Sequence, residues 1–111
     1  MNIVVNKDSP IEIHDQISRQ IIFAITSGEL SNGDALPSVR GLGPEIDVHF
    51  NTVNKAYQTL GRESIAKSRA GCGYFVAADG FAMAEAWLQS YFEESLGILC
   101  REAIVSKSDL E

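Results

Sequence analysis

The 111-residue sequence lacks the features of membrane and secreted proteins. No apolar run approaches the roughly 18–20 residues that cross a bilayer, and residues 1–9 contain Lys7 and Asp8 in place of an apolar signal core. The only two cysteines, Cys72 and Cys100, are far apart with no histidine at ligand spacing, which argues against a disulfide framework or a zinc site. We therefore expect a reduced, cytoplasmic protein that has no membrane partner and holds no metal.

Common enzyme motifs are also absent from the sequence. It contains no nucleophile elbow, no phosphate-binding glycine loop before a helix, and no paired acid and base. Gly71 and Gly73 form a Gly-x-Gly pair, but they fall in an expected hairpin turn rather than ahead of a helix. We expect no enzyme activity, no catalytic residues and no cofactor.

A surplus of basic residues, typical of DNA-binding proteins, is missing as well, because the net charge is −6. The distribution is uneven: residues 36–76 carry five basic and three acidic side chains, a local charge of +2, which leaves −8 on the rest. Since charges more than roughly 8–10 Å apart are screened by salt, a basic face on an acidic body still attracts phosphate at short range.

The central part of the chain contains an amphipathic helix with an unusual polar side. Its apolar residues recur at i, i+3, i+4 and i+7, namely Val53, Ala56, Tyr57 and Leu60. The remaining positions carry amides and hydroxyls instead of the Glu–Lys pairs of a solvated helix. Amides and hydroxyls donate and accept hydrogen bonds, so this side is suited to base edges in a DNA groove, although a plain amphipathic helix has a similar pattern.

Two helices are expected before it. The first is predicted to begin at Ser9-Pro10, with Glu12 completing a capping box, and to end at Gly28. Before it, the β-branched residues 2–6 are compatible with an edge strand. Ser38 is expected to cap a second helix that Gly43-Pro44 shortens, kinks or breaks. Replacing these two residues with alanine is therefore predicted to stabilise the fold.

The end of the chain contains two further elements. Residues 65–69 and 74–77 are expected to form a hairpin around Ala70–Gly73. After a boundary at Asp79-Gly80, a helix with a wide aromatic stripe is expected to extend to about Cys100. Because one small neighbour would not bury this stripe, it is predicted to mediate dimerisation. The stripe comprises Phe81, Ala84, Trp87, Leu88, Tyr91, Phe92, Leu96 and Leu99.

In this order, the motifs closely resemble those of the GntR family of bacterial transcription regulators. The match extends from Pro10 to Val76 and includes Pro37-Ser38-Val39-Arg40, Val48–Val53, and the hairpin Arg69-x-Gly71-x-Gly73-aromatic-Phe-Val. The resemblance implies a mostly α fold with a small β-hairpin, a winged helix-turn-helix, in residues 1–78. It also implies an α-helical dimerisation tail in residues 79–111, similar to the small YtrA-type branch, whose members have such a tail instead of a large effector domain.

The resemblance further implies which residues contact DNA. Arg40 matches a family arginine that contacts DNA from the start of the second helix, and the hairpin tip, called the wing, lies along the minor groove. Asp47 occupies the turn position usually taken by glycine. Phe50 stands where the family often has a basic residue or proline, and Asn54 stands where it often has a basic residue. The complete predicted set is Arg40, His49, Phe50, Asn51, Thr52, Asn54, Lys55, Lys67, Arg69, Gly71 and Gly73.

The sequence thus predicts a homodimeric repressor that binds a palindromic site on double-stranded DNA. The alternative is a protein-interaction module that has kept the winged-helix fold and lost DNA recognition, which the acidic body and the absence of a basic residue at Asn54 leave open. Any small-molecule effector is unknown, and without a second large domain its pocket would lie in the tail or at the dimer interface.

Overall fold

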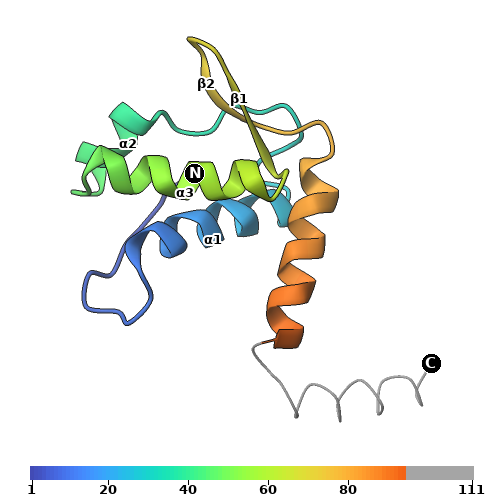
Figure 1. Cartoon of the computed structure of the whole chain (residues 1–111), viewed down its shortest axis with the longest axis horizontal. Helices are drawn as coiled ribbons and strands as arrows, with labels where there is room; N and C mark the ends of the chain where they lie inside the picture. The colour runs from blue at the N-terminus through green and yellow to red at the C-terminus, as the bar shows by residue number, and fades with distance from the viewer. Residues whose placement is uncertain (95–111) are drawn as a thin grey trace.

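Residues 1–94 are described by the structure, a computed structural model, as helices and one hairpin. The elements are α1 (Ile13–Thr26), α2 (Val39–Glu45), α3 (Phe50–Arg62), β1 (Ala66–Arg69) and β2 (Gly73–Val76). A further helix covers residues 80–94 and is drawn without a label in Figure 1. This is a winged helix-turn-helix, and it is mostly helical as the sequence predicts. Within residues 1–94, no helix has the length and apolarity needed to cross a bilayer.

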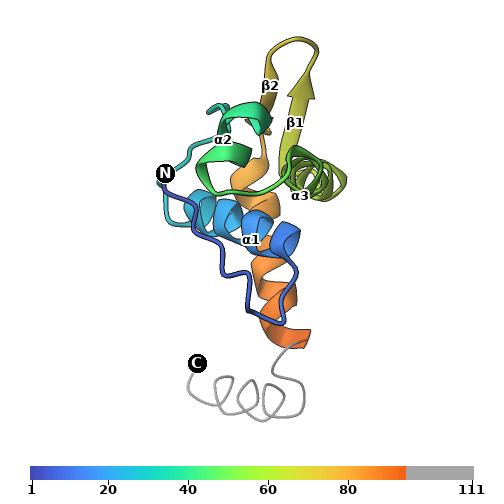
Figure 2. The same ribbon diagram turned by 90° about the vertical axis from the view of Figure 1, so that its left-hand side faces the viewer.

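The helices pack around one core, which is formed by the apolar residues that the sequence pattern places on one face of α1 and of α3. Figure 1 shows α1 beneath α3, with α2 near the start of α3, while the hairpin rises above them and the last helix passes the far end of α1. Seen from the side in Figure 2, the hairpin and α2 lie on the same side of α1. The fully buried residues include Ile17, Ile21 and Ile25 of α1 and Val53, Tyr57 and Leu60 of α3. Among the described residues, every buried side-chain nitrogen or oxygen has a hydrogen-bond partner, as a stable core requires.

The start of α1 differs from the sequence prediction. The helix begins at Ile13, and Glu12 occupies the N-cap position without a side-chain hydrogen bond. Ser9 does not cap the helix; its Oγ accepts a 3.1 Å hydrogen bond from the backbone of Ile11. The capping-box prediction was wrong because these residues form a separate turn before the helix.

Two glutamines of α1 hold the N-terminal segment, which is not the edge strand that its sequence suggested. The Gln20 amide accepts from the Val4 nitrogen at 3.0 Å and donates to the Val4 carbonyl at 2.7 Å. Gln16 makes the equivalent pair of bonds to Asn6, at 2.8 and 2.9 Å. These amides have the donor and acceptor groups of a neighbouring strand, so the segment satisfies its backbone without β pairing.

The second helix is short but not broken. The Ser38 Oγ caps it by accepting a 3.0 Å hydrogen bond from the Gly41 nitrogen, and Pro44 lies inside its last turn. Gly43 is buried, and its carbonyl accepts a 2.8 Å bond from the Val48 nitrogen. A Cβ at position 43 would lie 2.9 Å from the Val48 carbonyl oxygen. Gly43 therefore permits the close approach of the turn between α2 and α3, and this contact argues against the expectation that alanine at position 43 stabilises the fold.

Residues 34–36 add a short third segment to the hairpin, which the sequence did not reveal. Ala35 forms an antiparallel bridge with Phe75. The Leu36 nitrogen donates to the Tyr74 carbonyl at 2.9 Å, and the Val76 nitrogen donates to the Asp34 carbonyl at 2.8 Å. The free edge of β2 is thereby paired with the segment that leads into α2, so the position of α2 is linked to that of the hairpin.

The last helix is attached to this body through its first turns. The Phe81 nitrogen donates a 2.9 Å hydrogen bond to Asn32 Oδ1. Ala84 is fully buried in the common core, and Met83 and Trp87 pack against that core. Ala84 was predicted to mediate dimerisation, but burial within its own subunit makes it inaccessible to a partner.

Gly43→Ala is expected to lower the free energy of unfolding by about 1–3 kcal/mol, because the added methyl group collides with the backbone of the following turn. Pro44→Ala is the matched control, since it restores a backbone N–H in an exposed helical position and should be neutral or stabilising. Urea unfolding of both variants gives the comparison. A Gly43→Ala protein as stable as the unmodified chain would show that the turn moves aside without cost.

Candidate nucleic-acid interface

Arg40 lies between the start of α3 and the wing. It extends from the first turn of α2, which Ser38 caps, and it is exposed. It lines one hollow with Val48, His49 and Phe50, and a second hollow with Gly71, Cys72 and Gly73. No ion pair or hydrogen bond occupies its guanidinium among residues 1–94. Arg40 therefore presents free donors at the junction of the three elements that the sequence predicts to contact DNA.

A buried tyrosine holds these elements together. The Tyr57 hydroxyl donates a 2.6 Å hydrogen bond to the carbonyl of Pro37, just before α2. Burial raises the pKa of the Tyr57 phenol, so it remains a protonated donor at neutral pH. Its ring also meets Tyr74 of β2 edge to face, with centroids 5.3 Å apart. One side chain thus links α3 to both α2 and the wing.

The start of α3 carries a stacked aromatic pair. His49 is the N-cap residue, and its Nδ1 accepts a 3.1 Å hydrogen bond from the Asn51 nitrogen. An Nδ1 acceptor places the proton of the neutral ring on Nε2. The His49 ring stacks on Phe50 with centroids 4.6 Å apart, and Phe50 is 56% exposed. His49 therefore has a structural role as the cap, while Phe50 is directed to solvent instead of packing into the core.

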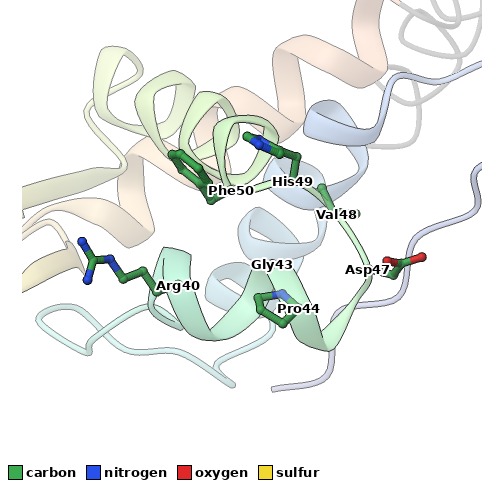
Figure 3. A pocket seen from close by; sticks show the side chains of 7 residues that line it. All are labelled: Arg40, Gly43, Pro44, Asp47, Val48, His49 and Phe50. Carbon is green, nitrogen blue, oxygen red and sulfur yellow. The ribbon is translucent and has the colours of Figure 1, made fainter.

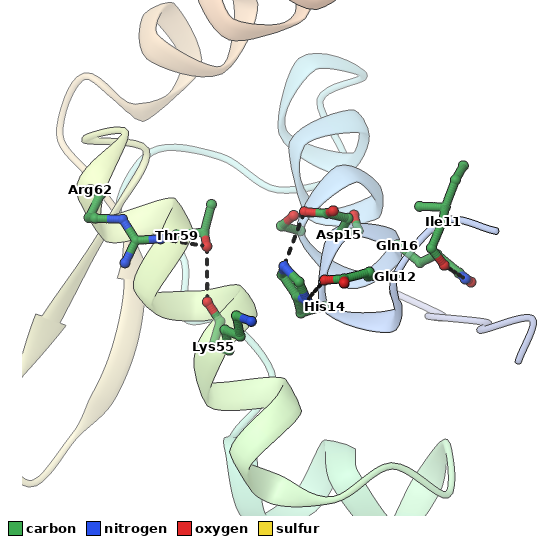
Figure 4. Close-up of polar contacts among 9 residues, drawn as sticks. Ile11, Glu12, His14, Asp15, Gln16, Lys55, Thr59 and Arg62 are labelled. Atoms are coloured by element: carbon green, nitrogen blue, oxygen red, sulfur yellow. Dashed lines mark hydrogen bonds and ion pairs between the residues drawn. The ribbon is translucent and has the colours of Figure 1, made fainter. Parts of the chain in front are cut away.

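The polar residues of α3 differ in their exposure. Asn51 and Lys55 are exposed, whereas Thr52 and Asn54 are half-buried. Toward the end of the helix, Thr59 Oγ1 donates to the Lys55 carbonyl at 3.0 Å and accepts from Arg62 at 3.1 Å, as Figure 4 shows. The structure therefore gives Asn51 the most accessible amide of this helix among the residues predicted to contact DNA.

The wing presents two cations and a tight tip. Lys67 and Arg69 are exposed on β1, and the Arg69 guanidinium lies 4.5 Å from the centroid of the Phe75 ring on β2. Gly71 and Gly73 have positive φ values of 75° and 88°, which bring the chain around the tip without steric strain. The cation–π contact holds Arg69 along the hairpin.

Arg62 was not among the predicted contact residues. It lines a hollow between α3 and β1 together with Gln58 and Lys67, so the structure brings a third cation close to the wing. The signal available in the sequence was its place four residues after Gln58, on the same polar side of the helix.

His14 lies apart from this surface, on α1. Its Nδ1 is 3.2 Å from Glu12 and its Nε2 is 3.4 Å from Asp15. Figure 4 shows these side chains beside the Lys55–Arg62 stretch of α3. The His14 side chain is only 15% exposed. These three residues are close enough to hold a metal ion, and each ring nitrogen of His14 faces a different carboxylate.

The aromatic stripe of the last helix is only partly available to a partner. Trp87 stacks on Tyr91 with centroids 5.3 Å apart, and Arg19 of α1 lies 4.7 Å from the centroid of the Tyr91 ring. These rings and Leu88 are half-buried, whereas Phe81 and Phe92 are 40% and 48% exposed. Leu96 and Leu99, also predicted for dimerisation, lie outside the described residues. Within the described part of the helix, Phe81 and Phe92 are therefore the rings of the stripe that remain most accessible to a partner chain.

Known proteins are similar to this chain along most of its length. Residues 13–76 match the family described as "Bacterial regulatory proteins, gntR family". The HTH-type transcriptional repressor YtrA of Bacillus subtilis is 31% identical over 109 residues, which is 98% of this chain and 84% of that protein. These matches cover both the helix-turn-helix region and the helix that follows the wing.

Solved structures share the same architecture. YtrA from Sulfolobus acidocaldarius, a GntR-family transcription factor, has a TM-score of 0.67 and 34% identity, covering 85% of this chain and 96% of that one. The DNA-binding domain of AraR in complex with operator ORX1 has a TM-score of 0.59 and 24% identity, covering 67% and 94% of the two chains. The AraR likeness shows the fold alone.

Tyr57→Phe is expected to lower the free energy of unfolding by about 0.5–1.5 kcal/mol, because the Pro37 carbonyl loses its donor while the ring packing is retained. Tyr74→Phe is the control, since its hydroxyl has no hydrogen-bond partner within residues 1–94 and its removal should change little. Urea unfolding of both variants measures the two changes in the free energy of unfolding, provided that the m-values are equal. Equal effects from the two changes would contradict a special role for the Tyr57 hydroxyl.

Proposed function

Since this chain belongs to the GntR family of bacterial regulatory proteins, we propose that it represses transcription by binding a palindromic operator as a homodimer. It is a transcription regulator of the YtrA-like branch, with a GntR-type DNA-binding domain. The B. subtilis relative is named a repressor, and the AraR domain that shares the fold was solved on its operator. The name of the B. subtilis relative supports the same direction of regulation here.

The observation that carries the proposal is the position of Arg40 between α3 and the wing. Its planar guanidinium forms paired hydrogen bonds to a phosphate or to a guanine edge. A duplex that reaches Arg40 also meets Phe50 at the start of α3 and the glycines of the wing tip, because the hollows that contain Arg40 extend to both. This arrangement supports simultaneous contact with neighbouring grooves.

The remaining polar residues divide by chemistry. Lys55, Lys67 and Arg69 are exposed cations, suited to phosphates, which are alike in every sequence. Arg69 also lies along the wing and is placed to enter a narrow minor groove. Asn51, Thr52 and Asn54 have short hydrogen-bonding side chains, suited to base edges. In this proposal the first group supplies most of the affinity and the second supplies the sequence preference.

The two-fold assembly rests on the last helix. Phe81 and Phe92 expose aromatic surface on a helix whose inner side is already packed against the body. Pairing with the same helix of a second chain would bury these rings in a symmetric contact. Two wings and two α3 helices related by a two-fold axis then require two inverted half-sites, which is the reason to expect a palindromic operator.

A pair of substitutions tests whether the cations supply the affinity for DNA and the short polar residues supply the sequence preference. Lys67→Gln should weaken binding to all duplexes about equally and reduce the salt slope by about one unit. Asn54→Ala should leave non-specific binding unchanged and cost about 1–3 kcal/mol of discrimination at one base pair. Titrations on the preferred and a scrambled duplex at several salt concentrations measure both effects.

The unmodified protein serves as the control for this test. If the unmodified protein binds the preferred and the scrambled duplex with equal affinity at every salt concentration, the operator proposal is refuted. That result would favour the protein-interaction module. An unchanged ratio after Asn54→Ala would transfer base recognition to Arg40, Asn51 or Thr52.

The double change Phe81→Ser and Phe92→Ser is expected to convert the dimer to a monomer without unfolding it, because both rings are exposed within the single chain. It should also weaken binding to the palindromic site far more than binding to a single half-site. Val4→Ser, at an exposed apolar residue outside the helix, is the control and should remain dimeric. Light scattering measures the assembly, and a full-length protein that is monomeric before any substitution would refute the dimer.

A further inference from the structure

Phe50 is the first residue of α3, and the core does not require it. More than half of its surface is exposed. Its aromatic contact within residues 1–94 is the stacked ring of His49. That contact restricts the Phe50 ring without covering it, so little conformational freedom would be lost if the exposed face were to meet a partner.

The hollow beside Phe50 combines an apolar lining with one cation. It has a volume of about 590 Å³ and is lined by Arg40, Gly43, Pro44, Asp47, Val48, His49 and Phe50. Figure 3 shows Arg40 and Phe50 on the same side of this hollow, with the Asp47 carboxylate at the opposite end. The Lys7 ammonium donates a 2.8 Å hydrogen bond to that carboxylate and offsets its charge. The end of the hollow near Phe50 is thus apolar, with a positive charge beside it.

This combination matches one base in the major groove of DNA. Among the four bases, only thymine presents an apolar group there, its 5-methyl group. An aromatic ring that covers this methyl group removes apolar surface from water, whereas it gains no hydrogen bond from the other base edges. The Arg40 guanidinium can donate hydrogen bonds to a phosphate or a guanine edge next to such a thymine.

We propose that Phe50 is a specificity-determining residue that packs against the 5-methyl group of a thymine, one in each operator half-site. The proposal rests on the function proposed above, because it requires α3 to lie in the major groove. Asn51, the next residue and an exposed one, then contacts a neighbouring base edge. The preferred operator contains a T·A pair next to the pair that Asn51 contacts.

The test removes single methyl groups from the DNA. The full-length protein first selects its preferred duplex from a randomised pool, and each thymine of that duplex is then replaced in turn by deoxyuridine, which lacks the 5-methyl group and keeps every hydrogen bond. At one position per half-site the replacement should weaken binding about fourfold, and replacement in both half-sites about fifteenfold. Phe50→Ala changes both half-sites of the dimer, so it should weaken binding to the thymine duplex by about as much as the replacement in both half-sites. The variant should bind the thymine duplex and the uridine duplex equally well.

Thr52→Ser is the matched control, since Thr52 carries a methyl group in the first turn of α3 that, unlike those of Val53, is not fully buried. This variant should retain the difference between thymine and uridine. The proposal is overturned if no thymine is sensitive, if the sensitive position remains so in Phe50→Ala, or if Thr52→Ser alone abolishes the difference. In each of these cases the operator function itself stands, because the selected duplex is still preferred over a scrambled one. A pool that yields no preferred duplex refutes both proposals together.

Discussion

The Tyr57 side chain connects the elements that present the candidate DNA contacts, through the hydrogen bond of its hydroxyl to the Pro37 carbonyl and the contact of its ring with the wing. Tyr57 belongs to α3, Pro37 leads into α2 and its Arg40, and the edge of the Tyr57 ring meets Tyr74 in the wing. Since the ring is buried and the hydroxyl is protonated at neutral pH, this contact persists across the physiological pH range. Together with the pairing of residues 34–36 to β2, this contact fixes the positions of the two hollows that share Arg40 relative to each other.

The acidic character of the chain affects how such a surface works. Most of the negative charge lies outside residues 36–76, so the attraction to phosphate is local and is limited by screening to the near surface. Binding should therefore depend more on well-placed contacts than on a long-range field. This is consistent with a surface in which amides, hydroxyls and an exposed aromatic ring outnumber the cations at the start of α3.

Local patterns predicted those elements whose stability is local. The apolar spacing of Val53, Ala56, Tyr57 and Leu60 located α3, and the two glycines of the wing located the hairpin turn. The cap at Ser38 was also confirmed. In each of these cases the deciding interactions lie within a few residues of one another, so sequence spacing contains the information. The structure brings Arg40 together with His49 and Phe50 in one hollow and with Gly71 and Gly73 in another, and the contacts of the site residues with DNA remain predictions.

The sequence by itself located α3 and the hairpin turn, because periodicity and turn chemistry are short-range properties, and its resemblance to GntR regulators indicated the fold class and the family. Only the tertiary structure decided that Gln16 and Gln20 replace a strand partner, that Gly43 admits the backbone of Val48, and that Ala84 belongs to the core. It also decided that Phe50 faces solvent while Thr52 and Asn54 are partly covered. The physical reason is common to all of these cases: burial and hydrogen bonding there depend on groups distant in the chain, and their proximity arises only when the helices pack.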